Sequence, residues 1–171
     1  MVAVRHTSFA PHIPPDTRLL ILGSLPGARS LAERQYYAHP TNQFWRLLSE
    51  VIGEQLAAMS YEDRLAALRT AKVGLWDVIR SAERHGSSDS QIREADPHDL
   101  ATLVSGLPDL RMVAFNGSKA ATIGRKQMPP LGGVTVVDLP SSSAAHTIGF
   151  AAKLASWIRL RAALAGVQPS R

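Results

Sequence analysis

Four short apolar runs constrain the fold of this chain more than any other feature. Each has the length of a buried strand and is followed by glycine, proline or polar residues, and together they cover residues 18–23, 73–79, 111–115 and 134–139. Segments with apolar residues at helical spacing separate these runs. Nearly continuous apolar strands that alternate with helices are typical of a parallel sheet covered on both faces. The sequence therefore predicts a three-layer α/β/α fold with a central four-stranded, mainly parallel sheet.

The remaining segments are predicted as helices, a loop and an extended lead-in. Residues 1–17 contain three prolines and are expected to be extended, and the polar stretch 80–95 is expected to be a long surface loop. Asp96 followed by Pro97 is a typical helix start. The expected helices cover residues 28–34, 42–52, 61–71, 97–105, 118–127 and 148–164. No repeat or second domain is visible, so residues 1–171 are expected to form a single domain.

The chain has no cysteine, and this removes several function classes at once. Disulfides, thiol nucleophiles, zinc–cysteine sites and iron–sulfur clusters are all excluded. The six histidines show no metal-ligand spacing, so no metal site is expected. No apolar run approaches the roughly 20 residues that a membrane span needs, and the N-terminus lacks the apolar core of a signal peptide. We expect a soluble, cytoplasmic protein without a membrane partner.

The charge of the chain favours a partner that carries phosphates. The formal net charge is +5, and arginine supplies 15 of the 19 basic residues. Arginine presents a planar fork of donors that suits phosphate oxygens, which points to nucleic acid. The arginines are scattered and form no block, so a generically basic surface is the alternative.

Three loops follow the predicted strands at the edge of the sheet where ligands bind in open α/β folds. The first, residues 23–27, is poor in side chains and lets a phosphate or a flat base approach, but it has neither the lysine of a nucleotide-triphosphate loop nor a dinucleotide fingerprint. The second contains Asn116, whose amide can pair with a donor and an acceptor on a base edge. The third, residues 140–146, offers hydroxyls suited to phosphate oxygens. Taken alone, the first loop and Asn116 are better explained as ordinary turns, and the third loop is equally compatible with a helix cap.

Further polar groups are expected near these loops. In the His-Pro-Thr-Asn turn at residues 39–42 the proline keeps the preceding residue extended and the threonine or asparagine can cap the next helix, so its polar groups are expected to face the glycine loop. Tyr36 and Tyr37 suit stacking on a base, with partial burial in the core as the equal alternative. Asp77 and Asp89 can act as acid or base groups, or as caps and ion-pair partners.

The order and spacing of four motifs resemble the uracil-DNA glycosylase superfamily, most closely its hypoxanthine-DNA (deoxyinosine) glycosylase branch, from residue 19 to about residue 160. The motifs are Gly-Ser-Leu-Pro-Gly at 23–27, Tyr-Tyr-Ala-His-Pro-Thr-Asn-Gln-Phe-Trp at 36–45, Phe-Asn-Gly at 115–117 and Leu-Pro-Ser-Ser-Ser-Ala-Ala-His at 139–146. The resemblance implies a base-excision repair enzyme with that family's fold. It flips a deaminated base out of DNA and hydrolyses its N-glycosidic bond without metal or cofactor. We expect it to act as a monomer.

The resemblance also assigns the catalytic residues. Members of the superfamily usually carry Asp or Asn at the third position of the first loop to hold the attacking water, and this chain has Leu25 there. The hypoxanthine branch likewise lacks that residue and relies on the asparagine of its His-Pro-x-Asn turn, which corresponds to Asn42. The catalytic residues are therefore expected to be Asn42, which positions the water, and Ser24. The role of Ser24 is a mechanistic hypothesis rather than part of the resemblance: Asn116 and backbone N–H groups near Ser24 stabilise the departing base.

The remaining motif residues are expected to bind the base and the DNA. In the mismatch-specific branch the aromatic residue before Ala-His-Pro stacks on the flipped base, and it corresponds to Tyr37 here. The expected base-binding residues are Gly23, Leu25, Tyr37, His39 and Asn116, and the expected DNA-binding residues are Ser141, Ser142, Ser143 and His146. The second motif departs from the branch pattern Ser-x-Ser-Pro-Ala-Asn, because it has alanine in place of proline and His146 in place of asparagine.

Three other interpretations stay open from the sequence. The same fold could act on uracil or on G:U and G:T mismatches, although Leu25 cannot orient water and argues against efficient uracil chemistry. The pocket could instead belong to a non-catalytic nucleic-acid-binding module. An unrelated small-molecule hydrolase on an open α/β sheet is the third alternative.

Overall fold

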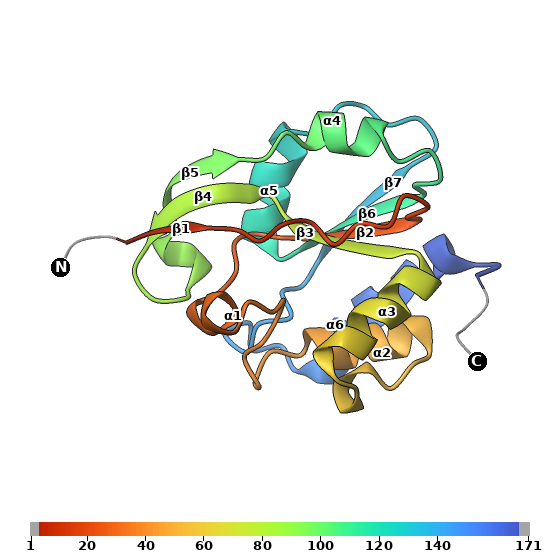
Figure 1. Ribbon diagram of the computed structural model, residues 1–171, viewed down its shortest axis with the longest axis horizontal. Coiled ribbons are helices and arrows are strands. Elements are labelled where there is room, and N and C mark those ends of the chain that lie inside the picture. The colour runs from red at the N-terminus through yellow and green to blue at the C-terminus, as the bar shows by residue number, and fades with distance from the viewer. Residues whose placement is uncertain (1–3, 168–171) are drawn as a thin grey trace.

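A four-stranded parallel sheet forms the centre of the molecule (Figure 1). The computed structural model describes residues 4–167, so the first three residues of the expected lead-in lie outside the described residues. The strands run in the order β3-β2-β6-β7, and every neighbouring pair is parallel. Their bounds are β2 Leu19–Gly23, β3 Val73–Asp77, β6 Met112–Asn116 and β7 Thr135–Leu139. The predicted central sheet is thus confirmed.

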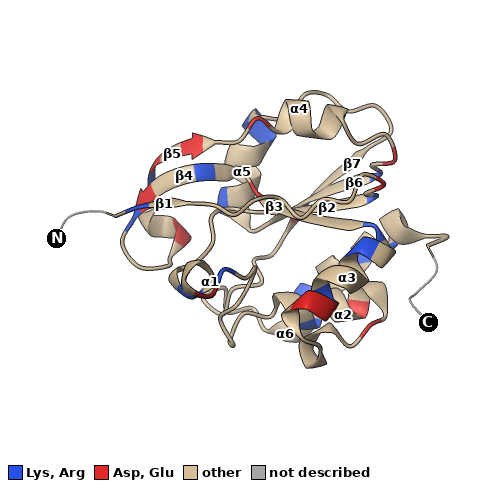
Figure 2. Cartoon of the chain, in the orientation of Figure 1, with Lys and Arg blue, Asp and Glu red and all other residues tan. Residues whose placement is uncertain are grey.

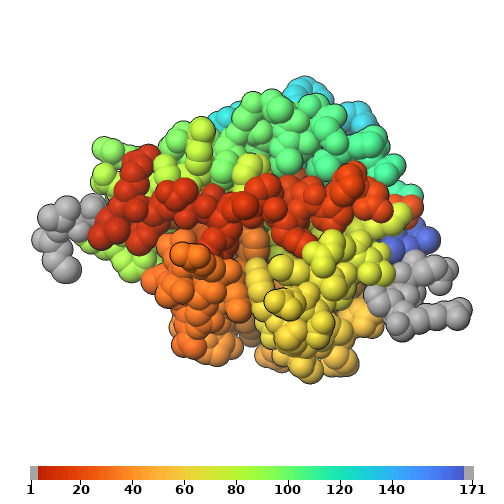
Figure 3. Space-filling view, viewed as in Figure 1, coloured from red at the N-terminus to blue at the C-terminus, as the bar shows by residue number. Residues whose placement is uncertain are grey.

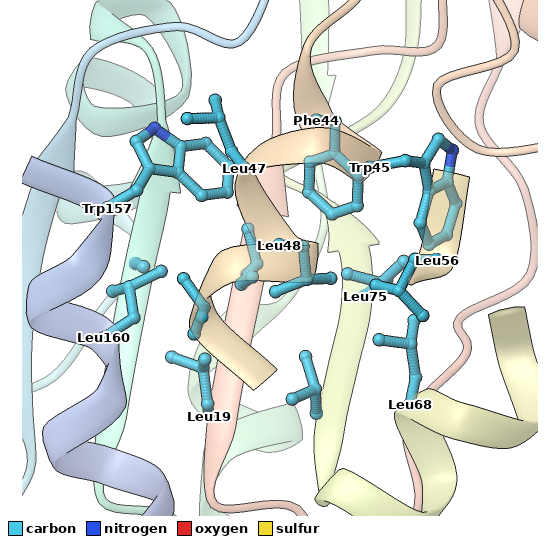
Figure 4. Close-up of a cluster of buried hydrophobic side chains, with 14 of the residues drawn as sticks. Leu19, Phe44, Trp45, Leu47, Leu48, Leu56, Leu68, Leu75, Trp157 and Leu160 are labelled. Atoms are coloured by element: carbon cyan, nitrogen blue, oxygen red, sulfur yellow. The ribbon is translucent and has the colours of Figure 1, made fainter. Parts of the chain in front are cut away.

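Helices cover both faces of this sheet because the side chains of its strands alternate between two apolar cores. The first core lies under α2 Phe44–Ile52, α3 Tyr61–Ala71 and α6 Phe150–Trp157, and the second lies under α4 Leu100–Ser105 and α5 Ser118–Lys126. Leu19 of β2 belongs to the first core, together with Phe44 and Trp157 (Figure 4). Its neighbour Leu20 belongs to the second. This alternation gives the predicted three layers.

A second, antiparallel sheet corrects the expectation for residues 80–95. It consists of β1 Val4–Thr7, β4 Ile79–Arg84 and β5 Arg93–Pro97, in the order β1-β4-β5. The prediction of a surface loop is wrong except for the residues between β4 and β5. The single strand predicted at 73–79 is divided at Val78, so that its residues belong to β3 and to β4. The apolar pattern of β4 is hidden because one of the side chains that it buries is Arg84. Backbone pairing, rather than apolar alternation, defines this sheet.

The structure also corrects the ends of two predicted helices. The sequence places a helix start at Pro97, but Pro97 pairs with β4, and Asp99 caps α4 by accepting a hydrogen bond from the Thr102 N–H at 3.1 Å. The last helix is α-helical only over α6 and continues as a 3₁₀ helix, η3 Ile158–Leu164. The other short helices are α1 Ala28–Glu33, η1 Leu56–Ala58 and η2 Asp89–Gln91.

The N-terminal lead-in covers the edge of the parallel sheet at β3. His12 exchanges two backbone hydrogen bonds with Leu75 of β3, at 3.0 and 2.8 Å. In Figure 3 this segment, coloured red, runs across the middle of the visible face. Pairing of this kind protects an edge strand from association with another chain.

Positions of basic and acidic residues are interspersed along the strands and helices of the chain (Figure 2). No single basic block dominates this view, in agreement with the scattered arginines of the sequence. Among the described helices, none is both long enough and apolar enough to cross a membrane.

Candidate active site

A cleft opens where β2, β3 and β6 end, at the edge of the sheet where open α/β folds bind ligands. Its volume is about 540 Å³, which is typical of sites for small molecules. Every predicted site residue lines it: Gly23, Ser24, Leu25, Tyr37, His39, Asn42, Asn116, Ser141, Ser142, Ser143 and His146. The fold therefore gathers four motifs that are far apart in the sequence into one place.

The two adjacent tyrosines have different environments. Tyr36 is buried in the core and its hydroxyl donates to the Ala10 carbonyl at 3.0 Å. Tyr37 is half-buried, and its ring stacks on Phe44 with centroids 3.7 Å apart and an interplanar angle of 11°. Its φ of 53° is left-handed, which costs a residue with a side chain about 1–2 kcal/mol, so packing must hold it there. Burial, with the nearby Asp77 carboxyl, raises the pKa of Tyr37, so the phenol stays neutral.

Asn116 joins the end of β6 to the serine loop, residues 141–143. Its Oδ1 accepts from the Ser142 N–H at 2.9 Å, and its Nδ2 donates to Ser142 Oγ at 2.9 Å. The same Nδ2 donates to the Tyr37 hydroxyl at 3.2 Å. Asn116 and Ser142 are both buried and carry no charge. Because these polar groups are hydrogen-bonded within the protein, Asn116 holds the serine loop in a fixed position at this wall of the cleft.

Two buried side chains of α6 hold the serine loop from behind. The Lys153 ammonium donates to the Ser143 carbonyl at 2.8 Å, and the Trp157 indole N–H donates to the Pro140 carbonyl at 3.1 Å. Burial lowers the pKa of Lys153. Sequence reasoning missed this support, although residues four apart on a helix share a face.

The opposite wall of the cleft contains ionisable side chains. The Ser24 hydroxyl donates to Asp89 Oδ1 at 2.7 Å. Arg84 of β4 is 2% exposed, and its guanidinium donates to two backbone carbonyls of the loop at residues 23–27. A buried cation therefore fixes the path of the glycine loop. Sequence reasoning placed Arg84 in a surface loop and missed this contact.

Asp77 ends β3 beside this loop and lines the cleft. It is 4% exposed, and its Oδ2 has no hydrogen-bond partner within residues 4–167. Burial first, and then the Asp89 charge, raises the pKa of Asp77 to about 7, while Arg84 opposes the shift. The sequence suggests Asp77 as a general acid or base, or as a cap or ion-pair partner. The pairing of Asp77 with Gly23 across β2 and β3 places it at the ligand-binding edge.

Asn42 and His39 lie at the more exposed end of the cleft, before α2. Asn42 is half-buried, and its Oδ1 accepts from the Phe44 N–H at 3.0 Å, but the N-cap residue of α2 is Gln43 rather than the expected Thr41 or Asn42. His39 is exposed, and its Nδ1 accepts from the Thr41 N–H at 3.2 Å. In the part of the chain that the structure describes, no three His, Asp or Glu side chains are grouped so as to hold a metal ion.

Comparison with known proteins places the chain in a family. The family model described as the uracil DNA glycosylase superfamily matches residues 10–161. The chain belongs to this superfamily. The cleft described above is therefore the candidate active site of a DNA glycosylase, and the predicted resemblance is confirmed.

Two relatives and one solved structure extend this result. A hypoxanthine DNA glycosylase of Methanosarcina barkeri is 44% identical over 117 residues, which are 68% of this chain and 74% of that protein. Another, from Methanosarcina acetivorans, is 44% identical over 131 residues, 77% of this chain and 82% of that protein. The solution NMR structure of a candidate uracil DNA glycosylase from Methanosarcina acetivorans has a TM-score of 0.81 at 36% identity and covers 94% of this chain and 99% of that one. These similarities confirm the glycosylase-like fold, and the two relatives support the hypoxanthine branch.

Proposed function

We propose that this glycosylase removes hypoxanthine from deoxyinosine in DNA, as a step of base excision repair. It flips the deaminated base out of the duplex and hydrolyses its N-glycosidic bond. The observation that carries the proposal is the convergence of all four motifs on one cleft. The two relatives named hypoxanthine DNA glycosylases, each 44% identical to this chain, support the same substrate.

The flipped base stacks on Tyr37. Phe44 covers one face of the Tyr37 ring, and the residue also lines the cleft, so the base meets the other face. Flipping costs a few kcal/mol, less for a weakened base pair, and stacking on an aromatic side chain contributes about 1–3 kcal/mol. Selection of a deaminated base therefore begins before the bond is broken.

Four further residues complete the base site. Asn116 reads the base edge, and this contact replaces its hydrogen bond to the Tyr37 hydroxyl, which at 3.2 Å is the longest of its three. Gly23 leaves room beside the base for Asp77 and for the Tyr37 hydroxyl, which a Cβ atom there would contact, and Leu25 supplies an apolar wall. His39 contacts the base from the exposed end of the cleft.

Hydrolysis needs a placed water, because the sugar gains oxocarbenium character and the base gains negative charge as the bond breaks. Asn42 holds this water through its Oδ1, which has a second lone pair besides the one that accepts from the Phe44 N–H. Backbone N–H groups near Ser24 stabilise the departing base. Leu25 has no group that could orient water, so this role goes to Asn42.

The serine loop and His146 hold the DNA. Ser141 and Ser143 are half-buried and His146 is exposed, so these side chains contact the phosphates beside the flipped nucleotide. Ser142 is 1% exposed and bonded to Asn116, so it contributes by holding the loop in shape. One chain supplies every motif residue, and we expect a monomer in the cytoplasm.

The substrate is tested by single-turnover excision from duplexes that each carry one deoxyinosine, deoxyuridine, deoxyxanthosine or mismatched thymidine. We expect hypoxanthine to be excised fastest. Faster excision of uracil or thymine would be consistent with a DNA glycosylase but would overturn hypoxanthine as the proposed substrate. Duplex binding without excision of any base would favour a non-catalytic binding module.

A further inference from the structure

We propose that Asp77 is a further catalytic residue, which in its protonated form donates a proton to a ring nitrogen of hypoxanthine as the glycosidic bond breaks. The proposal rests on the function proposed above, because it concerns the leaving group of the same reaction. It is carried by the place of the carboxyl in the cleft, by its unpaired oxygen and by the groups that surround it.

Asp77 lies at the buried end of the base site. A Cβ atom built on Gly23 would lie 2.6 Å from Asp77 Oδ1 and 2.9 Å from the Tyr37 hydroxyl oxygen, so both groups flank the same glycine. A base stacked on the Tyr37 ring therefore brings its inner edge beside this carboxyl. Asn42, which holds the water, lies at the more exposed end. The position suits a group that acts on the base rather than on the water.

The enclosed, unpaired oxygen of Asp77 favours the protonated form of this carboxyl. Buried carboxyl oxygens are normally hydrogen-bonded within a protein. Asp77 is 4% exposed and lines the cleft, but its Oδ2 is buried and has no partner within the described residues, so the carboxyl meets a bound base through Oδ1, which lies beside Gly23. A purine ring nitrogen is an acceptor, and it satisfies the O–H of a protonated carboxyl when the base enters.

The surroundings of Asp77 favour this protonated form. Burial is the main cause, and Asp89, which the Ser24 hydroxyl holds in place, adds a like charge, so the pKa of Asp77 rises to about 7. Arg84 opposes the shift, but its guanidinium donates to backbone carbonyls. The Tyr37 phenol is neutral and adds no charge. Near neutral pH a large share of the enzyme therefore carries a transferable proton.

The step balances without any other reactant. The C1′–N9 bond breaks and its electron pair goes to the base, while the proton of Asp77 goes to a ring nitrogen, so hypoxanthine leaves as a neutral molecule. The water held by Asn42 adds its oxygen to C1′, and its proton returns to the Asp77 carboxylate through the solvent. Deoxyinosine and water thus give hypoxanthine and an abasic site, and the acid is restored.

The proposal is tested by single-turnover excision of hypoxanthine over a range of pH. The wild-type rate should fall as pH rises through about 7, because the acid must be protonated. Asp77→Asn should be slower by about 10²- to 10⁴-fold below that pH, without this pH dependence. Asp89→Asn keeps an acceptor for the Ser24 hydroxyl but removes the negative charge near Asp77, which lowers the pKa of Asp77. The decrease in excision rate should therefore occur at lower pH in this variant and should not disappear.

Substrate analogues separate proton transfer from a structural role. Duplexes with 7-deaza- or 3-deaza-deoxyinosine each lack one ring nitrogen of the base. The wild type should excise the analogue that lacks the protonated nitrogen more slowly than hypoxanthine. On that analogue, Asp77→Asn should reduce the excision rate little further. If Asp77 only supports the fold, the losses from the variant and from each analogue will be additive.

Three outcomes would overturn the inference. The Asp77→Asn variant could excise hypoxanthine as fast as the wild type, or the excision rate of the wild type could rise as pH increases through 7. The third outcome is that the loss from Asp77→Asn and the loss from the analogue are additive for both analogues. Circular dichroism and thermal unfolding check that Asp77→Asn is folded. If this variant is not folded, the change in the pH dependence of excision by Asp89→Asn tests the proposal. Failure of the proposed function looks different, because the wild type would then leave hypoxanthine in DNA.

Discussion

On the β6 side of the cleft Asn116 and Ser142 pair with each other, whereas on the β3 side Asp77 and Arg84 are buried ionisable groups and Asp89 is half-buried. The Asn116–Ser142 pair is neutral and hydrogen-bonded, so its shape does not change with pH while Lys153, behind the serine loop, stays protonated. The second wall holds a buried carboxyl, one oxygen of which has no hydrogen-bond partner within residues 4–167, and a proton or a ligand can stabilise it. The difference shows how one small site separates a rigid support from groups that can react.

The charged wall should make stability depend on pH, and this is the largest expected effect. The pKa of Asp77 is about 7 in the folded protein against a usual 3.8, so the folded state holds a proton that unfolding releases between those values. The free energy of unfolding therefore decreases as pH rises from about 4 to about 7, by up to about 4 kcal/mol, and the loss persists above that range. Urea unfolding at a series of pH values measures this decrease.

Asp77→Asn is the matched variant for this prediction, because it keeps the shape of the side chain and cannot ionise. The difference in unfolding free energy between the variant and the wild type should grow from about pH 4 to about pH 7 in favour of the variant. A constant difference across that range would show that Asp77 is not the titrating group.

Asn116→Ala should reduce the free energy of unfolding by the same amount at all pH values, because it removes hydrogen bonds of the neutral wall. The substitution removes three hydrogen bonds and leaves the buried N–H of Ser142 without an acceptor, which we expect to cost about 2–3 kcal/mol of stability. Urea unfolding at acid and alkaline pH should give the same loss. Thr122→Ala, on the exposed surface of α5, is the control and should lose little. A loss that varies with pH would contradict the contrast between the two walls.

Tyr37→Ala tests the surface between the two walls, with the smallest expected effect. Loss of stacking should weaken productive flipping by about tenfold to hundredfold, measured from the enzyme concentration that half-saturates single-turnover excision. Tyr37→Phe keeps the ring stacked on Phe44 and should retain most activity. Unchanged excision by the alanine variant would remove the stacking role.

The parallel sheet could be predicted because its strands are buried on both faces. Residues 19–22 are fully buried, and the apolar run in the sequence records that environment directly. Strands β1, β4 and β5 could not be found in this way, because their side chains are largely polar and β4 buries Arg84. Their antiparallel pairing depends on partners distant in the sequence, which a local pattern does not contain.

The position of the site could be predicted because parallel strands end at the same edge. Gly23 and Asn116 end neighbouring strands, and the serine loop follows the next one. Arg84 and Lys153 were not predictable, since a buried cation is explained only by the backbone carbonyls that it satisfies. Those carbonyls come together only in the folded chain.

Single-turnover excision of hypoxanthine by Asn42→Ala and Asn42→Ser, beside the wild type, tests most directly whether this cleft hydrolyses the glycosidic bond. Asn42→Ser retains an oxygen that can accept from the Phe44 N–H, so it controls for loss of this hydrogen bond at the start of α2. The account predicts that both variants fold and bind the duplex but lose excision by roughly 10²-fold or more. Wild-type excision by the alanine variant would contradict it.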